Sequence, residues 1–143
     1  MELADISLRD KIQLLEDQMK QLPQISIQPD HFFCKGLYAR SLVHPAGVLI
    51  TGKVHKKEHM FMLVSGDITV WTEDGMKRIR GPYLVKSLPG TKRVAYAHVD
   101  SLVIAFVPTD MSENDSIEEV EQSMVCDTID QFLEYQRQLE GGE

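Results

Sequence analysis

The residues best suited to chemistry gather in one stretch, GVLITGKVHKKEHMFMLVSG, which runs from Gly47 to Gly66. It contains Lys53, His55 and His59, side chains that can exchange protons, ligate a divalent metal ion or hold an anion. The two histidines are four residues apart, but the segment reads HKKEH rather than HExxH and lies among β-branched and aromatic residues. A zinc-protease helix is therefore not expected here.

The distribution of charge bears on which ligand this stretch would take. The net charge of −7 divides into −3 for residues 1–30, +6 for residues 31–108 and −10 for residues 109–143, and all five histidines lie in the middle segment. Two interpretations stay open: an acidic arm lies on the basic centre and neutralises it, or the centre holds an anionic ligand. The overall negative charge argues against nucleic-acid binding.

The middle segment is expected to consist of short strands. It is rich in Val, Ile, Phe and Tyr and is interrupted every 8–12 residues by Gly, Pro or Asp-Gly, a pattern typical of a sandwich or barrel. Gly66-Asp67 and Asp74-Gly75 predict tight hairpins. The predicted strands are Ala39–Val43, Val48–Thr51, His59–Val64, Ile68–Thr72, Lys77–Ile79, Tyr83–Ser87, Val94–Ala97 and Ser101–Val107.

Both ends of the chain are expected to be helical. Apolar residues recur at spacings of four and three from Leu8 to Leu22, after a capping signal at Ser7, and Pro23 ends the run. A helix this short must dock, either on its own chain or on a second subunit. Residues 112–140 contain neither Pro nor Gly and predict one long curved helix, or two helices that break near Cys126.

These features predict one domain in three parts: an amphipathic helix and lead-in over 1–30, a β-barrel over 31–108 and an acidic helical arm over 109–143. No apolar run is long enough to span a bilayer, and MELADISLRD is too acidic for a signal peptide. Two widely spaced cysteines favour a reduced, cytoplasmic protein. Cys34, Trp71 and Phe106 are expected in the core.

The stretch from Gly47 to Gly66 resembles the first motif of the cupin family, which is a glycine, a His-x-His pair, an acid and a closing glycine. LPGTKRVAYA resembles the second motif, a Pro-Gly turn followed by a histidine. The resemblance covers about residues 36–108 and implies a mainly β fold, a cupin-type jelly-roll β-barrel, with the N-terminal amphipathic helix and the C-terminal acidic helical arm outside it. It maps the four metal-ligand positions of the family onto Lys53, His55, His59 and Arg93.

These substitutions shift the expected ligand from a metal ion to an anion. Lys53 and Arg93 would repel a divalent cation, so no cofactor is favoured; a metal ion, if bound, would use His55 and His59. The four side chains would instead offer hydrogen-bond donors and positive charge to a phosphate or carboxylate. The alternative is that Glu58, Asp67 or the acidic arm of a neighbouring subunit neutralises them. Three tyrosines are candidates for the pocket wall: Tyr38, Tyr83 and Tyr96.

The runs HFFCKGLYAR, TEDGMKRI and PGTKRVAYAH also resemble small cupin-like proteins of tailed bacteriophages, a group generally described as of unknown function. Three hypotheses follow: a non-catalytic protein that binds a small, nucleotide-like anion of the host, a phage structural or assembly protein, or a metal-dependent cupin enzyme. The first is favoured. We expect a homo-oligomer formed through the helices and barrel, no nucleic-acid or membrane partner, and a location in the host cytoplasm, with the virion as the alternative.

Overall fold

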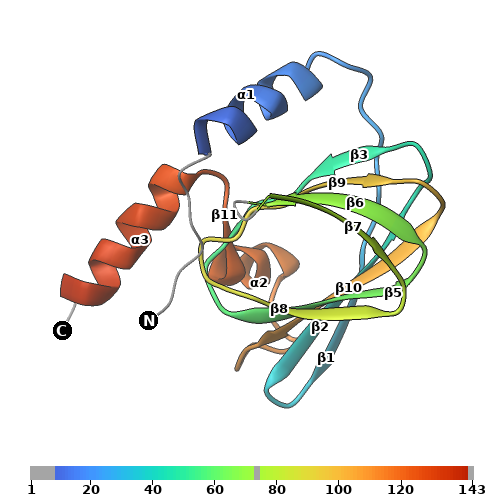
Figure 1. The fold of residues 1–143 in the computed structure, drawn as a ribbon. Helices are drawn as coiled ribbons and strands as arrows, with labels where there is room; N and C mark the ends of the chain where they lie inside the picture. The colour runs from blue at the N-terminus through green and yellow to red at the C-terminus, as the bar shows by residue number, and fades with distance from the viewer. Residues whose placement is uncertain (1–8, 73–74, 142–143) are drawn as a thin grey trace.

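Two antiparallel β-sheets face one another, and helices lie at one end of the pair (Figure 1). The computed structural model describes residues 9–72 and 75–141. In chain order the elements are α1 (Arg9–Met19), β1 (Asp30–Cys34), β2 (Leu37–His44), β3 (Leu49–Thr51), β4 (Val54–His55), β5 (His59–Ser65), β6 (Asp67–Thr72), β7 (Gly75–Arg80), β8 (Tyr83–Ser87), β9 (Val94–Ala97), β10 (Ser101–Pro108), α2 (Ile117–Met124), β11 (Val125–Cys126) and α3 (Ile129–Gly141).

The larger sheet has five strands in the order β1-β2-β10-β5-β8. Its side chains alternate between an inner side, which faces the other sheet, and an outer side. On β2 the inner positions are Tyr38, Arg40, Leu42 and His44, which all line one internal cavity. The periodicity of the sequence thus places apolar and ionisable groups on the same inner side.

The smaller sheet has four strands in the order β3-β9-β6-β7. The chain passes into it from β5 through Gly66, whose φ of 116° lies in the left-handed region that glycine adopts without strain. The inner residues of both sheets pack into one apolar cluster, which contains Leu63 of β5, Ile68 of β6 and Ile79 of β7. Ile68 of this cluster also lines the internal cavity, so the cluster and the cavity adjoin one another.

The sheets do not close into the expected barrel. Among the described residues, β8 ends the larger sheet and β7 ends the smaller one, and no ladder of hydrogen bonds joins their edges. The short strands β4 and β11 form a third, separate pair. The fold is therefore an open sandwich, in which apolar packing rather than continuous strand pairing holds the two sheets together.

The acidic C-terminal arm forms two helices separated by β11. Helix α2 begins after Ser116, whose side chain accepts a hydrogen bond from the backbone N–H of Glu119. Its buried residues Val120 and Met124 pack against Tyr38 of the larger sheet. Helix α3 follows the β11–β4 pair and extends outward from the body (Figure 1).

Helix α1 is joined to the body by an ion pair. The ammonium of Lys92, a residue with only 3% of its side chain exposed, lies 2.8 Å from a carboxylate oxygen of Glu16. Leu14 on the same helix is 60% exposed, so this helix is only partly covered by its own chain. Among the described residues, no helix is long and apolar enough to cross a membrane.

Several expectations from the sequence require correction. The structure adds β1, whose alternation turns Phe33 inward and leaves Cys34 exposed rather than buried. Trp71 is 37% exposed rather than in the core. The predicted cap at Ser7 and the Asp74 hairpin position lie outside the described residues.

Candidate functional site

The inner sides of the sheets and helix α2 enclose a cavity of about 330 Å³, which we call the central cavity. Its volume lies at the lower end of the range of small-molecule pockets. Apolar side chains form much of its wall, among them Leu42, Ile50, Phe61, Val103, Val107 and Met124. The ionisable side chains in the wall are Tyr38, Arg40, His44, Lys53, His55, His59, Arg93 and Glu121.

The two histidines of the motif lie face to face in this cavity. The ring centroids of His55 and His59 are 4.0 Å apart and the ring planes differ by 26°. His59 is 2% exposed, and its Nδ1 forms a hydrogen bond of 3.2 Å with the carbonyl oxygen of Lys57. Because Nδ1–H donates to that carbonyl, Nε2 carries the lone pair, and this buried atom has no hydrogen-bond partner among the described residues.

Both imidazoles are neutral at pH 7. Burial lowers the pKa of His59 to about 4; the hydrogen bond to Lys57 opposes this shift and the positive charge of Arg93 adds to it. The pKa of His55 is also well below its ordinary value, chiefly because of burial and further because of His59, Arg93 and Arg40. The histidines therefore supply hydrogen-bonding groups rather than positive charge to the central cavity.

The positive charge inside comes from two arginines, Arg40 and Arg93, that lie far apart in the sequence. Arg93 lies on the loop just before β9, donates a hydrogen bond to the hydroxyl of Ser87, and stacks over the ring of Phe61 with 4.4 Å from its guanidinium carbon to the ring centroid. Arg40 projects inward from β2, and no hydrogen bond or ion pair to another described residue holds its guanidinium. A small anion in the central cavity would thus meet charged donors from β2 and from the loop before β9.

One tyrosine and one carboxylate complete the polar wall. The hydroxyl of Tyr38 lies 2.6 Å from Nδ1 of His31, and burial raises the pKa of Tyr38 to about 12. Glu121 reaches the cavity from α2, and its charge acts on Tyr38 in the same direction as burial, opposite to Arg40. Tyr38 is therefore a neutral hydrogen-bonding group at physiological pH.

All four residues of the altered cupin motif line the central cavity, but Lys53 lies at its exposed edge. Its ammonium lies 3.2 Å from the carboxylate of Asp127, and the two side chains are 57% and 69% exposed. The acidic arm of the same chain thus pairs with one cation at the edge of the cavity. Neither Tyr83 nor Tyr96 lines the central cavity; Tyr83 contacts Lys77, and Tyr96 packs edge-on against His98.

Sequence reasoning missed Arg40 and Glu121. The alternation in the segment LYARSLVH, together with the choice of Tyr38 as a pocket residue, would have placed Arg40 on the same side two residues later. No comparable signal was available for Glu121, because its position depends on how α2 docks.

The side chains in the central cavity do not fit the divalent metal that the cupin resemblance implies. At the motif the cavity offers one pair of stacked imidazoles, those of His55 and His59. The positive charges of Arg93 and Arg40 lower the pKa of His55, so they oppose any further positive charge at this place. No group of three or more His, Cys, Asp or Glu side chains among residues 9–72 and 75–141 is placed to hold a metal ion. Divalent cations require neutral nitrogen or anionic ligands and are repelled by fixed positive charge.

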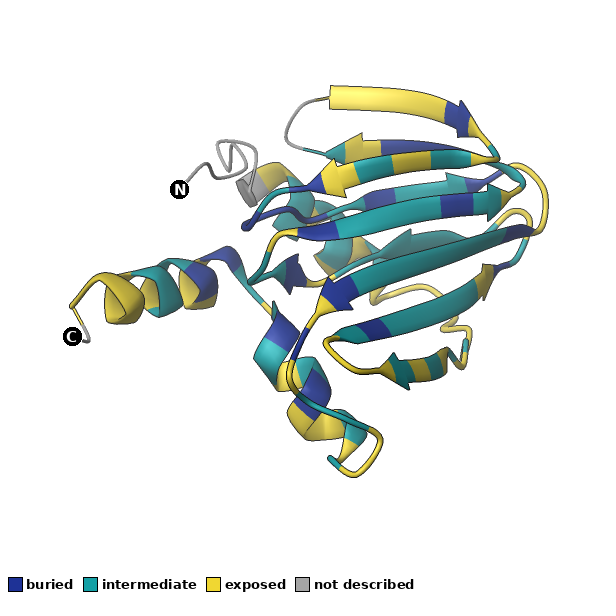
Figure 2. Ribbon diagram, turned by 90° about the horizontal axis from the view of Figure 1, so that it is seen from below, coloured by how far each residue is buried: buried dark blue, intermediate teal, exposed yellow. Residues whose placement is uncertain are grey.

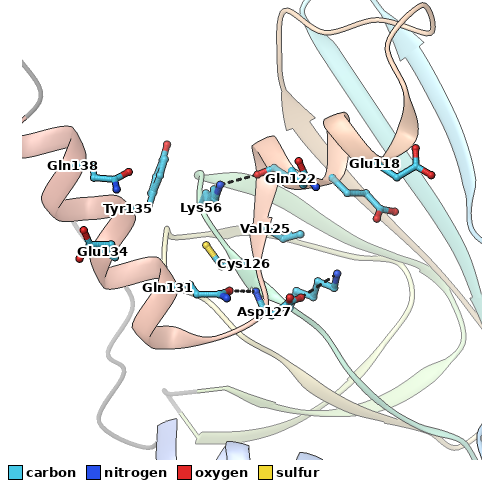
Figure 3. A pocket seen from close by; sticks show the side chains of 12 residues that line it. Lys56, Glu118, Gln122, Val125, Cys126, Asp127, Gln131, Glu134, Tyr135 and Gln138 are labelled. Atoms are coloured by element: carbon cyan, nitrogen blue, oxygen red, sulfur yellow. Dashed lines mark hydrogen bonds and ion pairs between the residues drawn. The ribbon is translucent and has the colours of Figure 1, made fainter.

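A second, open groove lies between α2 and α3 (Figure 3). The Lys56 ammonium donates a 2.7 Å hydrogen bond to the carbonyl oxygen of Gln122 and lies 4.8 Å from the ring centroid of Tyr135. Lys56 therefore connects both arm helices to the β4 region. Burial raises the pKa of the Cys126 thiol beneath the groove, which disfavours the reactive thiolate.

Comparisons with known proteins identify the fold. No protein-family model matches the chain, and no curated protein matches its sequence. KdgF from Halomonas sp. matches with a TM-score of 0.52 at 18% identity, over 64% of this chain and 87% of that one. An RmlC-like cupin from Shewanella frigidimarina gives 0.50 at 15%, over 64% and 88%. Salicylate 1,2-dioxygenase from Pseudoaminobacter salicylatoxidans gives 0.55 at 12%, over 80% and 32%. These matches show a mainly β, cupin-like jelly-roll fold.

Proposed function

We propose that the protein is a non-catalytic binding protein that holds a compact organic anion in the central cavity. The observation that carries this proposal is the pair Arg40, on β2, and Arg93, on the loop before β9, which both line a cavity that is otherwise largely apolar. A ligand with an apolar body and one carboxylate or phosphate group matches such a wall. The resemblance to small phage cupin-like proteins favours a small anion of a bacterial host.

The neutral histidines give this proposal a pH dependence. An anion beside His55 and His59 would stabilise their protonated forms and raise their pKa values from the lowered values of the free protein. Binding would then take up protons, and by linkage the affinity should increase as the pH falls from 7 toward 5. A neutral ligand would not show this coupling.

The test is a calorimetric titration with three anions, benzoate, AMP and inorganic phosphate, and with benzamide as the neutral counterpart of benzoate. Arg40→Met should weaken binding of the anion that binds wild type by about 10- to 100-fold, since a hydrogen bond to a charged group contributes roughly 1.5–3 kcal/mol. Arg80→Met is the matched control, because Arg80 lies on β7, is 74% exposed and pairs with Asp67 rather than lining the cavity.

The results separate the alternatives. Tight binding of one anion, lost in Arg40→Met and kept in Arg80→Met, supports the proposal. If none of the three anions binds wild type at millimolar concentration, or if benzamide binds as well as benzoate, the proposal is wrong.

A further inference from the structure

One buried nitrogen in the wall of the central cavity, Nε2 of His59, has no hydrogen-bond partner among the described residues. The side chain is 2% exposed, and the carbonyl oxygen of Lys57 holds the proton on Nδ1, so Nε2 is a hydrogen-bond acceptor. The strands β2, β5 and β10, which contribute to the cavity wall, are buried or half-buried along most of their length, unlike the outer end of α3 (Figure 2). Buried polar atoms in native proteins normally have a partner, so this acceptor requires an explanation.

The neighbouring side chains do not supply the missing donor. His55 is stacked on His59 with 4.0 Å between the ring centroids, and the N–H bonds of an imidazole lie in its own ring plane rather than toward a stacked ring. Arg93 donates to the hydroxyl of Ser87 instead. Nε2 is also the ring nitrogen farther from the backbone, on a side chain that lines the cavity. A molecule in the central cavity is therefore well placed to provide the donor.

This acceptor adjoins one of the two arginines. His59 at the start of β5 is the cross-strand partner of Ser87 at the end of β8. Side chains of such partners project to the same side of the sheet, with Cβ atoms about 4.5–5.5 Å apart. Because the Arg93 guanidinium is bonded to Ser87, it lies beside the His59 imidazole. The pKa of His59 is lowered by burial and further by the charge of Arg93, in keeping with this placement.

We infer that the ligand of the central cavity is a hydroxy acid, whose hydroxyl donates a hydrogen bond to Nε2 of His59 while its carboxylate lies against the guanidinium of Arg93. The inference rests on the proposed function, since it requires an anion in this cavity. Because the two protein groups adjoin one another, the hydroxyl belongs on the carbon that bears the carboxylate or on the next one. The apolar body of the ligand then lies against the apolar wall, which includes Phe61 and Val103. His59 thereby determines specificity among small acids.

A hydroxyl suits this position better than the other groups that small acids carry there. The ammonium of an amino acid also donates, but the positive charges of Arg93 and Arg40 would repel it, as they oppose protonation of His55. The carbonyl oxygen of a keto acid only accepts and would face the lone pair of Nε2. A hydroxyl both donates and accepts, so it can keep its contact with His59 when binding at lower pH protonates the imidazole.

The test is a calorimetric titration of the full chain at pH 8, where His59 is neutral, with two matched series of acids. One series is mandelate, phenylglyoxylate and phenylacetate, and the other is lactate, pyruvate and propionate. Within each series the carbon next to the carboxylate carries a hydroxyl, a ketone or only hydrogen, and each enantiomer of a hydroxy acid is measured separately. In at least one series the hydroxy acid should bind about 10-fold more tightly than the other two acids. Phenylglycine, which replaces the hydroxyl of mandelate by an ammonium, should bind more weakly than mandelate.

Two variants connect this preference to one atom. His59→Phe keeps a planar ring but removes the acceptor, so the hydroxy acid should bind no better than its counterpart without the hydroxyl. His98→Gln is the matched control and should keep the 10-fold preference, because His98 bonds to Thr69 outside the cavity. Circular dichroism checks that both variants fold, and the wild-type series decide alone if His59→Phe does not.

Three results would overturn the inference: no preference for the hydroxy acid in either series, a preference that survives in His59→Phe, or no binding of any of these acids at millimolar concentration. The titration with benzoate, AMP and phosphate judges the proposed function separately. An anion that binds through Arg40 without any gain from a hydroxyl would leave that function standing and refute only the role of His59.

Discussion

Lowering the pH from 7 to 5 should destabilise the folded protein measurably through His59. This imidazole is 2% exposed, and its pKa in the folded chain is about 4, against 6.5 as its ordinary value. Folding therefore holds His59 in its neutral form over a pH range in which the unfolded chain binds a proton. The free energy of unfolding depends on pH wherever the two states bind different numbers of protons.

The sign and size follow from the two pKa values. Above pH 6.5 His59 is neutral in both states and has no effect on the pH dependence. As the pH falls from 6.5 to 4, only the unfolded chain takes up the proton, so stability is lost; below pH 4 both states are protonated and the loss is constant. Between pH 7 and pH 5 the decrease is about 1.8 kcal/mol. His55 adds to the loss, because its pKa is lowered as well.

The assay is urea unfolding followed by circular dichroism at pH 7, 6 and 5, at one fixed protein concentration. The range stops at pH 5 because carboxylates begin to titrate in the unfolded chain below it. Asp67 is one of these, since hydrogen bonds from Arg78 and then Arg80 hold its pKa well below the ordinary value. His59→Gln should reduce the pH dependence by about 1.8 kcal/mol.

His98→Gln is the matched control, because it removes an imidazole that lies outside the central cavity and bonds to Thr69. It should retain the wild-type pH dependence, since His55 and His59 are untouched. The reasoning is refuted if His59→Gln shows the same change in unfolding free energy between pH 7 and 5 as the wild type.

Two further predictions concern the scaffold. Gly66→Ala should lower the free energy of unfolding by about 2 kcal/mol or more, because its Cβ would lie 2.1 Å from Oγ of Ser101 at a φ of 116°. Gly47→Ala should lower it by only about 1 kcal/mol, because φ is 79° there and nothing lies within 4 Å of the added Cβ. Equal losses of the two variants in urea unfolding would contradict the steric argument. Glu16→Gln should lower stability by about 1.5 kcal/mol and speed hydrogen exchange in α1, because it replaces a charge-assisted hydrogen bond to buried Lys92 with a weaker one. Unchanged exchange would show that this ion pair does not hold the helix.

Local patterns in the sequence predicted much of the strand framework. The strands β8 and β9 have the predicted bounds, and the hairpin at Gly66 lies where the Gly-Asp pair indicated it. These features depend on near neighbours: alternation sets the side of each residue in a strand, and glycine permits a positive φ. The resemblance of two motifs to the cupin family implied a jelly-roll barrel; the structural matches show a cupin-like fold, and the sheets do not close into a barrel.

Other features could not be obtained from local patterns. Alternation separates the residues of a strand into two sides, but it does not say which side is buried when both are apolar, as the inward Phe33 and the exposed Cys34 illustrate. Likewise, the failure of the sheets to close depends on whether β7 and β8, at the edges of the two sheets, meet in space.

The amino-acid sequence by itself determined the basic character of residues 31–108 and brought Lys53, His55, His59 and Arg93 forward as a group. Only the tertiary structure decided what that group is: neutral stacked histidines, Lys53 paired with Asp127 at the edge, and Arg93 joined by a second arginine. The physical reason is that charge type is a property of each residue, whereas protonation and pairing depend on burial and on distances between segments far apart in the chain.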